Sequence, residues 1–130
     1  IIDGSRIQQV LVNLLSNAAR YGGEQCLVVG WADGSTLVIE VHDSGPGIPK
    51  KHELTIWERF ERGQNRYNAA VPGSGIGLAM VKSIAQAHGG RASYRRSNRL
   101  GGACFVVELP GRVGKQRPIA VVPFSTRAIG

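Results

Sequence analysis

Residues 72–90 read PGSGIGLAMVKSIAQAHGG, a glycine-rich run that opens directly into a helical pattern. The apolar residues of the pattern fall on one side of the expected helix: Leu78, Val81, Ile84 and Ala85. The glycines at 89–90 are a typical helix end. The first N–H groups of a helix favour a bound anion, because they lack partners within the helix and carry partial positive charge. A plain turn is the alternative, since glycine suits many turns.

Two common phosphate-binding motifs do not fit this run. A P-loop requires Lys and then Ser or Thr directly after its last glycine, where Leu78 and Ala79 stand here. A dinucleotide-binding fingerprint follows a strand and opens a βαβ unit, whereas residues 63–73 are small and polar. The remaining interpretation is a mobile loop whose backbone amides close over phosphates at the helix N-terminus.

Regular elements are expected on both sides of this loop. Residues 5–20 place apolar side chains at helical spacing, and Asp3 to Ser5 provide N-cap candidates. The expected strands are 26–32, 36–43, 91–96 and 103–110, of which the first two are joined by the short turn DGS as a hairpin.

Three side chains beside these elements have the chemistry of a nucleotide site. Asp43 ends a strand just before the flexible GPG at 45–47, where a carboxylate can accept a hydrogen bond from an amine such as that of adenine. Turn capping is the alternative role for this residue. Asn17, in a polar stripe of the first helix with Asn13, offers a neutral oxygen to a hard cation such as Mg²⁺. Arg20, one turn later, can contact a phosphate.

Four motifs in this order resemble the catalytic and ATP-binding domain of sensor histidine kinases, within the GHKL superfamily that includes type II topoisomerases and mismatch-repair ATPases. They are RIQQVLVNLLSNAARYG at 6–22, DSGPGIP at 43–49, IWERFERG at 56–63 and GSGIGLAMVKSIAQAHGG at 73–90, which resemble the N, G1, F and G2 boxes. The resemblance covers residues 3–110. It implies a two-layer α/β sandwich, the Bergerat fold, with a mixed, mostly antiparallel sheet, helices on one face and a flexible ATP lid.

Carried over by position, the resemblance implies a site for ATP and Mg²⁺. Asn17 would coordinate Mg²⁺ with Asn13 as a second contributor, Arg20 would contact the phosphates, and Asp43 would hold the adenine amine. The other implied binding residues are Tyr21 at the base or ribose, Gly45, Gly47 and Ile48 as the pocket floor, Phe60 as the lid anchor, Arg62 at a phosphate, and Ser74, Gly75, Ile76, Gly77 and Leu78 over the phosphates. The implied catalytic set is Asn13, Asn17, Arg20 and Arg62. Ala103 stands where many members have a hydroxyl residue.

The resemblance also bears on the type of reaction. Hydrolysing branches of the superfamily place a Glu as general base one turn before the Mg²⁺-binding Asn. Asn13 stands there in this chain and cannot accept a proton, which favours a kinase that donates the γ-phosphoryl of ATP to a histidine on a separate dimerisation domain. A stand-alone ATPase and a non-catalytic ATP-binding or interaction module remain open.

The phosphoacceptor histidine is expected outside this chain. His52 in KKHELT at 50–55 superficially resembles the start of a phosphoacceptor motif, but it lies in the usual spacer between two boxes, without an amphipathic helix around it. The implied partners are therefore the dimerisation and phosphoacceptor helical domain of the same kinase and the receiver domain of a response regulator. The resemblance further implies a monomeric isolated domain, a homodimeric full-length protein and a cytoplasmic location within a membrane-associated sensor.

Length and composition fit one domain of 130 residues. We divide the chain into an ATP-binding catalytic domain at 1–110 and a basic, partly flexible tail at 111–130, whose IAVVPF at 119–124 can pair with a sheet edge. The start at Ile1 lacks a signal-peptide pattern and suggests a fragment of a larger protein.

The formal charge of +7 does not indicate nucleic-acid binding. Four of the basic residues and no acidic residue follow Pro110, so the body of the chain is only mildly basic, and its arginines at 91–99 suit a solvated strand pair. Cys26 and Cys104 lie far apart in apolar stretches without metal-ligand spacing and are expected to be buried thiols.

Overall fold

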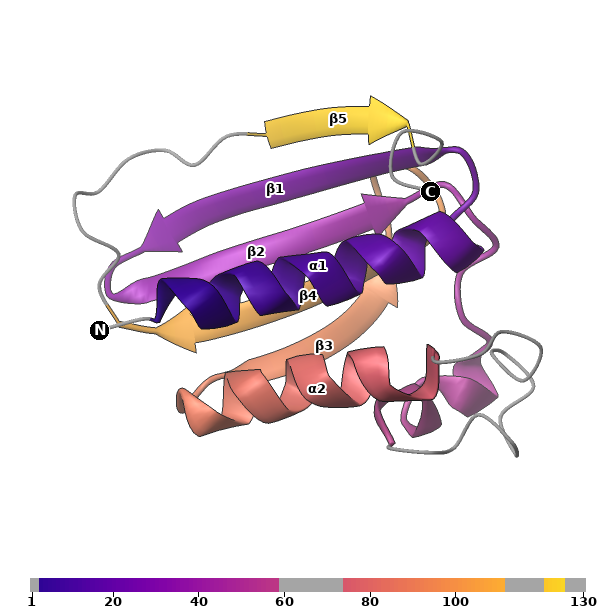
Figure 1. Cartoon of the computed structure of the whole chain (residues 1–130). Helices are drawn as coiled ribbons and strands as arrows, with labels where there is room; N and C mark the ends of the chain where they lie inside the picture. The colour runs from indigo at the N-terminus through magenta and orange to yellow at the C-terminus, as the bar shows by residue number, and fades with distance from the viewer. Residues whose placement is uncertain (1–2, 59–73, 112–120, 126–130) are drawn as a thin grey trace.

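The computed structural model describes residues 3–58, 74–111 and 121–125. They form a two-layer α/β sandwich in which two long helices pack on one face of a five-stranded sheet (Figure 1). The strand order is β3-β4-β2-β1-β5, and every ladder between the described strands is antiparallel. The predicted fold class, a mostly antiparallel sheet with helices on one face, is confirmed.

Helix α1 spans Gly4–Tyr21, with Asp3 as its N-cap. One oxygen of the Asp3 carboxylate accepts hydrogen bonds from the hydroxyl and the N–H of Ser5, at 2.8 and 2.9 Å, and the hydroxyl lowers the pKa of this carboxyl most. The cap satisfies one of the N–H groups that a helix start leaves without a partner. The helix buries three residues at the predicted spacing: Val10, Leu14 and Ala18.

Strands β1 (Gln25–Asp33) and β2 (Thr36–Asp43) form the predicted hairpin. The turn between them contains Gly34 at φ 62°, a conformation that glycine adopts at little cost. At the other end of the ladder Cys26 pairs with Asp43, so the last residue of β2 remains within the sheet.

Strands β3 (Arg91–Arg96) and β4 (Ala103–Pro110) form a second hairpin, and β4 continues the sheet by pairing with β2. In this register His42 of β2 lies opposite Cys104 of β4. The turn at 97–102 therefore lies at the same end of the sheet as Asp43.

Strand β5 (Val121–Ser125) pairs with the outer edge of β1. Pro123 is compatible with this position because an edge strand does not need every N–H for a ladder. The basic tail thus contributes a strand to the sheet, which overlaps the segment that the sequence offered as able to pair with a sheet edge.

Helix α2 (Ser74–Ala87) lies beside α1 and ends at the predicted glycines. Gly89 has φ 77°, and the N–H of Gly90 donates to the carbonyl of Ala85 at 2.8 Å. Two short 3-10 helices, η1 (Lys50–His52) and η2 (Thr55–Trp57), precede α2 in the chain. His52 thus lies in an isolated turn of 3-10 helix within the spacer between two motifs.

The helices and the inner face of the sheet share one hydrophobic core. The sheet contributes Leu37, Ile39, Val41, Phe105, Val107 and Leu109, and α2 contributes Leu78, Val81, Ile84 and Ala85. Phe105 packs edge to face against Trp57 of η2, with 5.9 Å between ring centroids, and against Tyr94 of β3 at 5.6 Å. In the described segments no helix is long and apolar enough to cross a membrane.

We predict that Phe105→Ala lowers the free energy of unfolding by about 3–5 kcal/mol, because it removes the ring that joins β3, β4 and η2. Val12→Ala is the matched control, since Val12 is 56% exposed, and its effect should stay within about 0.5 kcal/mol. Chemical denaturation of both variants measures the difference. Equal losses for the two variants would contradict this description of the core.

Candidate functional site

The carboxylate of Asp43 lies at the end of β2, where it is 4% exposed. Its Oδ1 accepts the N–H of Gly45 at 3.0 Å and the N–H of Ala103 at 2.9 Å. In the part of the chain that the structure describes, no hydrogen bond reaches Oδ2. One oxygen thus holds the surrounding backbone, and the other is available to a ligand.

Three glycines let the backbone approach this carboxylate closely. A Cβ atom on Gly102 would overlap Asp43 Oδ1, and one on Gly22 would lie 2.7 Å from Asp43 Cβ. A Cβ atom on Gly45 would lie 2.5 Å from the carbonyl oxygen of Tyr21. Larger side chains at these three positions would displace Asp43 or the two segments that flank it.

Burial raises the pKa of the Asp43 carboxyl. The N–H groups of Ala103 and Gly45 oppose this change by stabilising the ionised form, as does the positive charge of Arg96 to a smaller extent. The net effect is a carboxylate that lacks some of the solvation and hydrogen bonding it would have in water. A ligand that donates a hydrogen bond to Oδ2 would supply part of what is missing.

Strand β3 holds the loop that follows Asp43. The hydroxyl of Tyr94 accepts the N–H of Ile48 at 3.0 Å, and Arg96 donates to the carbonyl of Pro46 at 3.0 Å. Gly47 has φ 77°, and a Cβ atom there would overlap the Arg96 guanidinium. The sequence identified Gly47 and Ile48 but not Tyr94 and Arg96. Only the strand pairing brings those two side chains, about fifty positions away, to this loop.

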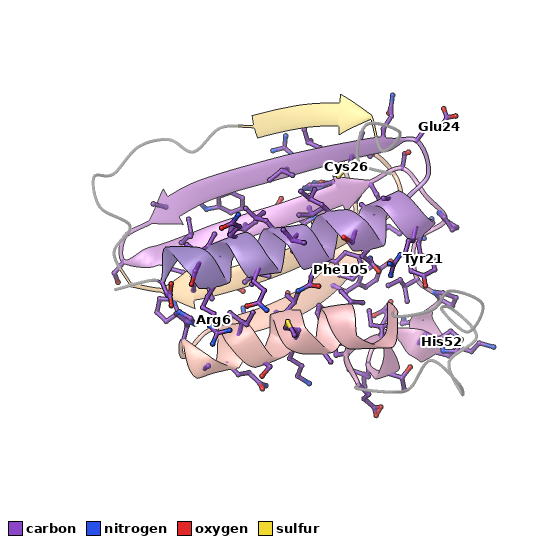
Figure 2. The ribbon with its side chains drawn as sticks, in the orientation of Figure 1. Arg6, Tyr21, Glu24, Cys26, His52 and Phe105 are labelled. Carbon is purple, nitrogen blue, oxygen red and sulfur yellow. The ribbon has the colours of Figure 1, made fainter. Side chains whose placement is uncertain are left out.

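The C-terminal half of helix α1 carries four of the predicted residues. Asn13 donates to the carbonyl of Gln9 at 3.0 Å, while its Oδ1 would lie 3.6 Å from a Cβ atom on Gly77, in the first turns of α2. Arg20 is exposed. Tyr21 lies at the C-terminal end of α1, on the side of the molecule that carries the short helices (Figure 2). The end of α1 thus lies beside the Asp43 region, while Asn13, two turns earlier, faces the first turns of α2.

The side chain of Asn17 indicates whether the residues of this site can accommodate a metal ion. Its Nδ2 is buried and has no hydrogen-bond partner among the described residues. Rotating the amide by half a turn exchanges oxygen for nitrogen, so this buried end can present Oδ1 to a cation. A neutral amide oxygen suits Mg²⁺, which usually keeps several waters and takes further ligands from phosphates. Asn17 and Oδ1 of Asn13 are therefore compatible with the predicted ion.

Part of the predicted site lies outside the described residues. Phe60 and Arg62 belong to the undescribed segment 59–73, so their roles remain predictions. Ser74, Gly75 and Ile76 are placed only as backbone in the first turn of α2, while Gly77 is half-buried and Leu78 lies in the core. The glycine run therefore does lead into a helix N-terminus, as predicted.

Residues 2–113 match the protein family described as histidine kinase-, DNA gyrase B-, and HSP90-like ATPase. This match covers most of the chain and includes Asp43, the glycines around it and the first turns of α2. The chain belongs to this family. The resemblance inferred from the four motifs is thereby confirmed.

Curated relatives with similar sequences include a sensor protein and a histidine-protein kinase/phosphatase. Sensor protein KdpD of Escherichia coli is 42% identical over 112 residues, which cover 84% of this chain and 12% of KdpD. The signal transduction histidine-protein kinase/phosphatase MprB of Mycolicibacterium paratuberculosis is 37% identical over 116 residues, covering 85% of this chain and 22% of MprB. The chain thus spans less than a quarter of the length of either relative.

Solved structures agree with this result. The ATP binding domain of PrrB from Mycobacterium tuberculosis superimposes with a TM-score of 0.65 at 30% identity, over 84% of this chain and 69% of that one. Mycobacterial sensor histidine kinase MprB gives a TM-score of 0.70 at 32% identity, over 86% of this chain and 74% of that one. Full-length ShkA in complex with AMPPNP gives a TM-score of 0.66 at 29% identity, over 88% of this chain and 23% of that one.

We predict that Asp43→Ala destabilises the protein without ligand and that Asp43→Asn does not. Ala leaves the N–H groups of Gly45 and Ala103 without an acceptor and should cost about 1–3 kcal/mol. Asn keeps an acceptor and removes a buried charge, so at neutral pH the variant should be at least as stable as the parent.

The pH dependence follows from the raised pKa of Asp43. A carboxyl that binds its proton more tightly in the folded state destabilises the fold as the pH rises through the folded-state pKa. Any advantage of Asp43→Asn should therefore disappear below the ordinary Asp pKa of about 3.9. Thermal unfolding between acidic and neutral pH measures both variants. A less stable Asn variant at neutral pH would contradict this account of the carboxylate.

Proposed function

We propose that this chain is the ATP-binding catalytic domain of a two-component sensor histidine kinase, and that it donates the γ-phosphoryl of ATP to a histidine on a separate domain. The observation that carries the proposal is the Asp43 carboxylate, with Oδ1 fixed by two N–H groups and Oδ2 available. Membership of an ATPase family and similarity to sensor kinases support it.

The residues around Asp43 would bind the adenine base. The exocyclic amine would donate to Asp43 Oδ2, which replaces a hydrogen bond that burial removes from the carboxylate. The loop at 45–48, held by Tyr94 and Arg96, would form the floor of the base pocket. Tyr21, at the end of α1, would contact the base or ribose.

The phosphates would lie between α1 and the start of α2. The N-terminal amides of α2 at 74–78 favour negative charge, and Arg20 and Arg62 would add positive charge at the phosphates. Phe60 would anchor the lid that covers them. Asn17, with Asn13, would hold a Mg²⁺ ion that neutralises phosphate charge when it is bound.

The position of Asn13 favours phosphoryl transfer over hydrolysis. An asparagine amide cannot take a proton from water at neutral pH, so α1 provides no general base at this position. In the proposed reaction a histidine ring nitrogen attacks the γ-phosphorus, the bond to the β,γ-bridging oxygen breaks and ADP leaves. Catalysis by this chain then consists of positioning and charge neutralisation.

The rest of the reaction depends on parts outside this chain. The chain spans only 12% of KdpD and 22% of MprB, so a dimerisation and phosphoacceptor domain of the same kinase would supply the histidine. A receiver domain of a response regulator would then accept the phosphoryl group. We propose a monomeric isolated domain, a homodimeric full-length protein and a cytoplasmic position for this domain.

Labelled ATP tests the proposed function. The chain is mixed with Mg²⁺, ATP labelled in the γ-phosphoryl group and a matching dimerisation domain added in trans. Acid-labile, base-stable label on a histidine of the added domain is the expected result. Phosphate release without any partner would instead favour a stand-alone ATPase, and ATP binding without labelling would favour a non-catalytic module.

We predict that Asn17→Ala weakens binding of ATP in the presence of Mg²⁺ by between about tenfold and a hundredfold, the effect of losing an interaction of about 1.5–3 kcal/mol. In EDTA the two proteins should bind ATP with similar affinity. Gln8→Ala, at an exposed position on the same helix, is the matched control. Calorimetry with and without Mg²⁺ measures the effect, and an equal loss under both conditions would argue against a metal-binding role for Asn17.

A further inference from the structure

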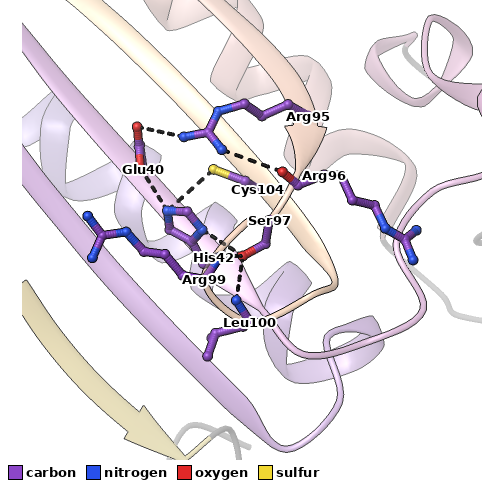
Figure 3. A network of polar contacts seen from close by, with 8 residues as sticks. All are labelled: Glu40, His42, Arg95, Arg96, Ser97, Arg99, Leu100 and Cys104. Carbon is purple, nitrogen blue, oxygen red and sulfur yellow. Dashed lines mark hydrogen bonds and ion pairs between the residues drawn. The ribbon is translucent and has the colours of Figure 1, made fainter.

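A buried polar network lies on the sheet face opposite the helices (Figure 3). Side chains alternate along β2, so Glu40 and His42 point away from the helices while Val41 points toward them. His42 is 0% exposed, Ser97 3% and Glu40 6%. Because unpaired buried polar groups are costly, a network this deep has to be closely matched in donors and acceptors.

The serine at the inner end of the network fixes the direction of its hydrogen bonds. Ser97 Oγ accepts the N–H of Leu100 at 2.9 Å and the N–H of Arg99 at 3.3 Å, which uses both lone pairs of the hydroxyl. The Ser97 O–H therefore donates to His42 Nδ1, 2.7 Å away. It follows that His42 accepts at Nδ1 and is neutral.

The remaining contacts follow from this tautomer. With its proton on Nε2, His42 donates to Glu40 Oε1 at 2.7 Å. Arg95 donates to the other oxygen, Oε2, at 2.9 Å. A continuous chain of hydrogen bonds thus runs from the partly exposed guanidinium of Arg95 to the backbone of the turn at 97–102.

That turn contacts Asp43 directly. The N–H of Ser97 donates to the carbonyl of Gly102 at 2.7 Å, and the N–H of Gly101 donates to the carbonyl of Ser97 at 3.0 Å. From the end of this closed turn, Gly102 donates to the Asp43 carbonyl at 3.0 Å and Ala103 donates to Asp43 Oδ1 at 2.9 Å. The network on one face of the sheet is therefore connected to the carboxylate on the other.

A metal ion is a weaker explanation for the same side chains. Potential ligand atoms of Glu40, His42 and Cys104 lie within 4.8 Å of one another. However, the tautomer places a proton on His42 Nε2, and burial raises the pKa of the Cys104 thiol to about 12. Two of the three ligand atoms thus carry protons that a metal would have to displace.

We propose that Ser97 and His42 are positioning residues for adenine recognition: they fix the turn at 97–102, and the turn orients the Asp43 carboxylate toward the amine of the base. This inference rests on the proposed function, because it assumes that ATP binds at Asp43. Glu40 and Arg95 hold His42 in the required tautomer. None of these four residues contacts the nucleotide itself.

The test compares two nucleotides that differ at the amine. The affinities of the full 130-residue chain and its variants for ATP and for inosine triphosphate, which has an oxygen in place of the amine, are measured by calorimetry. Ser97→Ala should weaken the binding of ATP by about tenfold and the binding of inosine triphosphate by less than about twofold. Only the contact between the base and Asp43 depends on the turn. Ser97→Thr keeps the hydroxyl and should restore most of the preference for ATP.

A second pair of variants separates the two ring contacts of His42. His42→Asn places an amide near the position of Nδ1 and can keep the contact to Ser97, whereas His42→Gln reaches the position of Nε2 and keeps only the contact to Glu40. We expect the Asn variant to retain the preference for ATP and the Gln variant to lose it. This pair decides the question if Ser97→Ala does not fold.

Hydrogen exchange of the Ala103 amide provides a measurement without nucleotide. Exchange should be faster in Ser97→Ala than in the parent, because the turn no longer fixes this N–H against Asp43. Absence of nucleotide binding by the parent chain would overturn the proposed function. A parent that binds ATP, with unchanged base preference and exchange in Ser97→Ala, would overturn the positioning role alone.

Discussion

The Asp43 carboxylate is buried at the end of β2, and the N–H groups of Gly45 and Ala103 hold it through a single oxygen. Burial of a charge is costly, and two hydrogen bonds to one oxygen repay only part of the cost. This arrangement requires backbone at van der Waals distance on several sides, which is why glycines stand at 22, 45 and 102. The requirement joins the end of α1, the loop after β2 and the turn before β4 into one site.

The two faces of the sheet have different roles in this arrangement. The helix face contributes the large core and the residues that would contact ATP and Mg²⁺. The opposite face carries a smaller apolar cluster of Val38, Cys104 and Val106 beside the Glu40–His42–Ser97 network. Because the turn at 97–102 passes from one face to the other, polar residues that are remote from the nucleotide site can influence its geometry. On our proposal, adenine specificity would depend on this whole end of the sheet and not on Asp43 alone.

Most of the fold followed from the sequence, since the apolar residues of α1, β2 and α2 recur at helical or strand periods and become buried as expected. Asp43, Asn17 and the glycines were found because their motifs are local in the chain. Tyr94, Arg96 and Ser97 were missed because their contacts to Ile48, Pro46 and His42 span 46 to 55 positions. Such contacts depend on the strand register, which no local pattern specifies. The β5 pairing was only one of two possibilities for the tail, because an edge strand has a weak sequence signal.

We propose that Oδ2 of Asp43 accepts a hydrogen bond from the amine of adenine. A crystal structure of the chain with Mg²⁺ and a non-hydrolysable ATP analogue tests it most directly. We expect the exocyclic nitrogen of the base about 3 Å from Asp43 Oδ2, with Oδ1 still accepting the N–H groups of Gly45 and Ala103 and the phosphates at the N-terminus of α2. A nucleotide bound with its base away from Asp43, or with Oδ2 contacting only water, would contradict it.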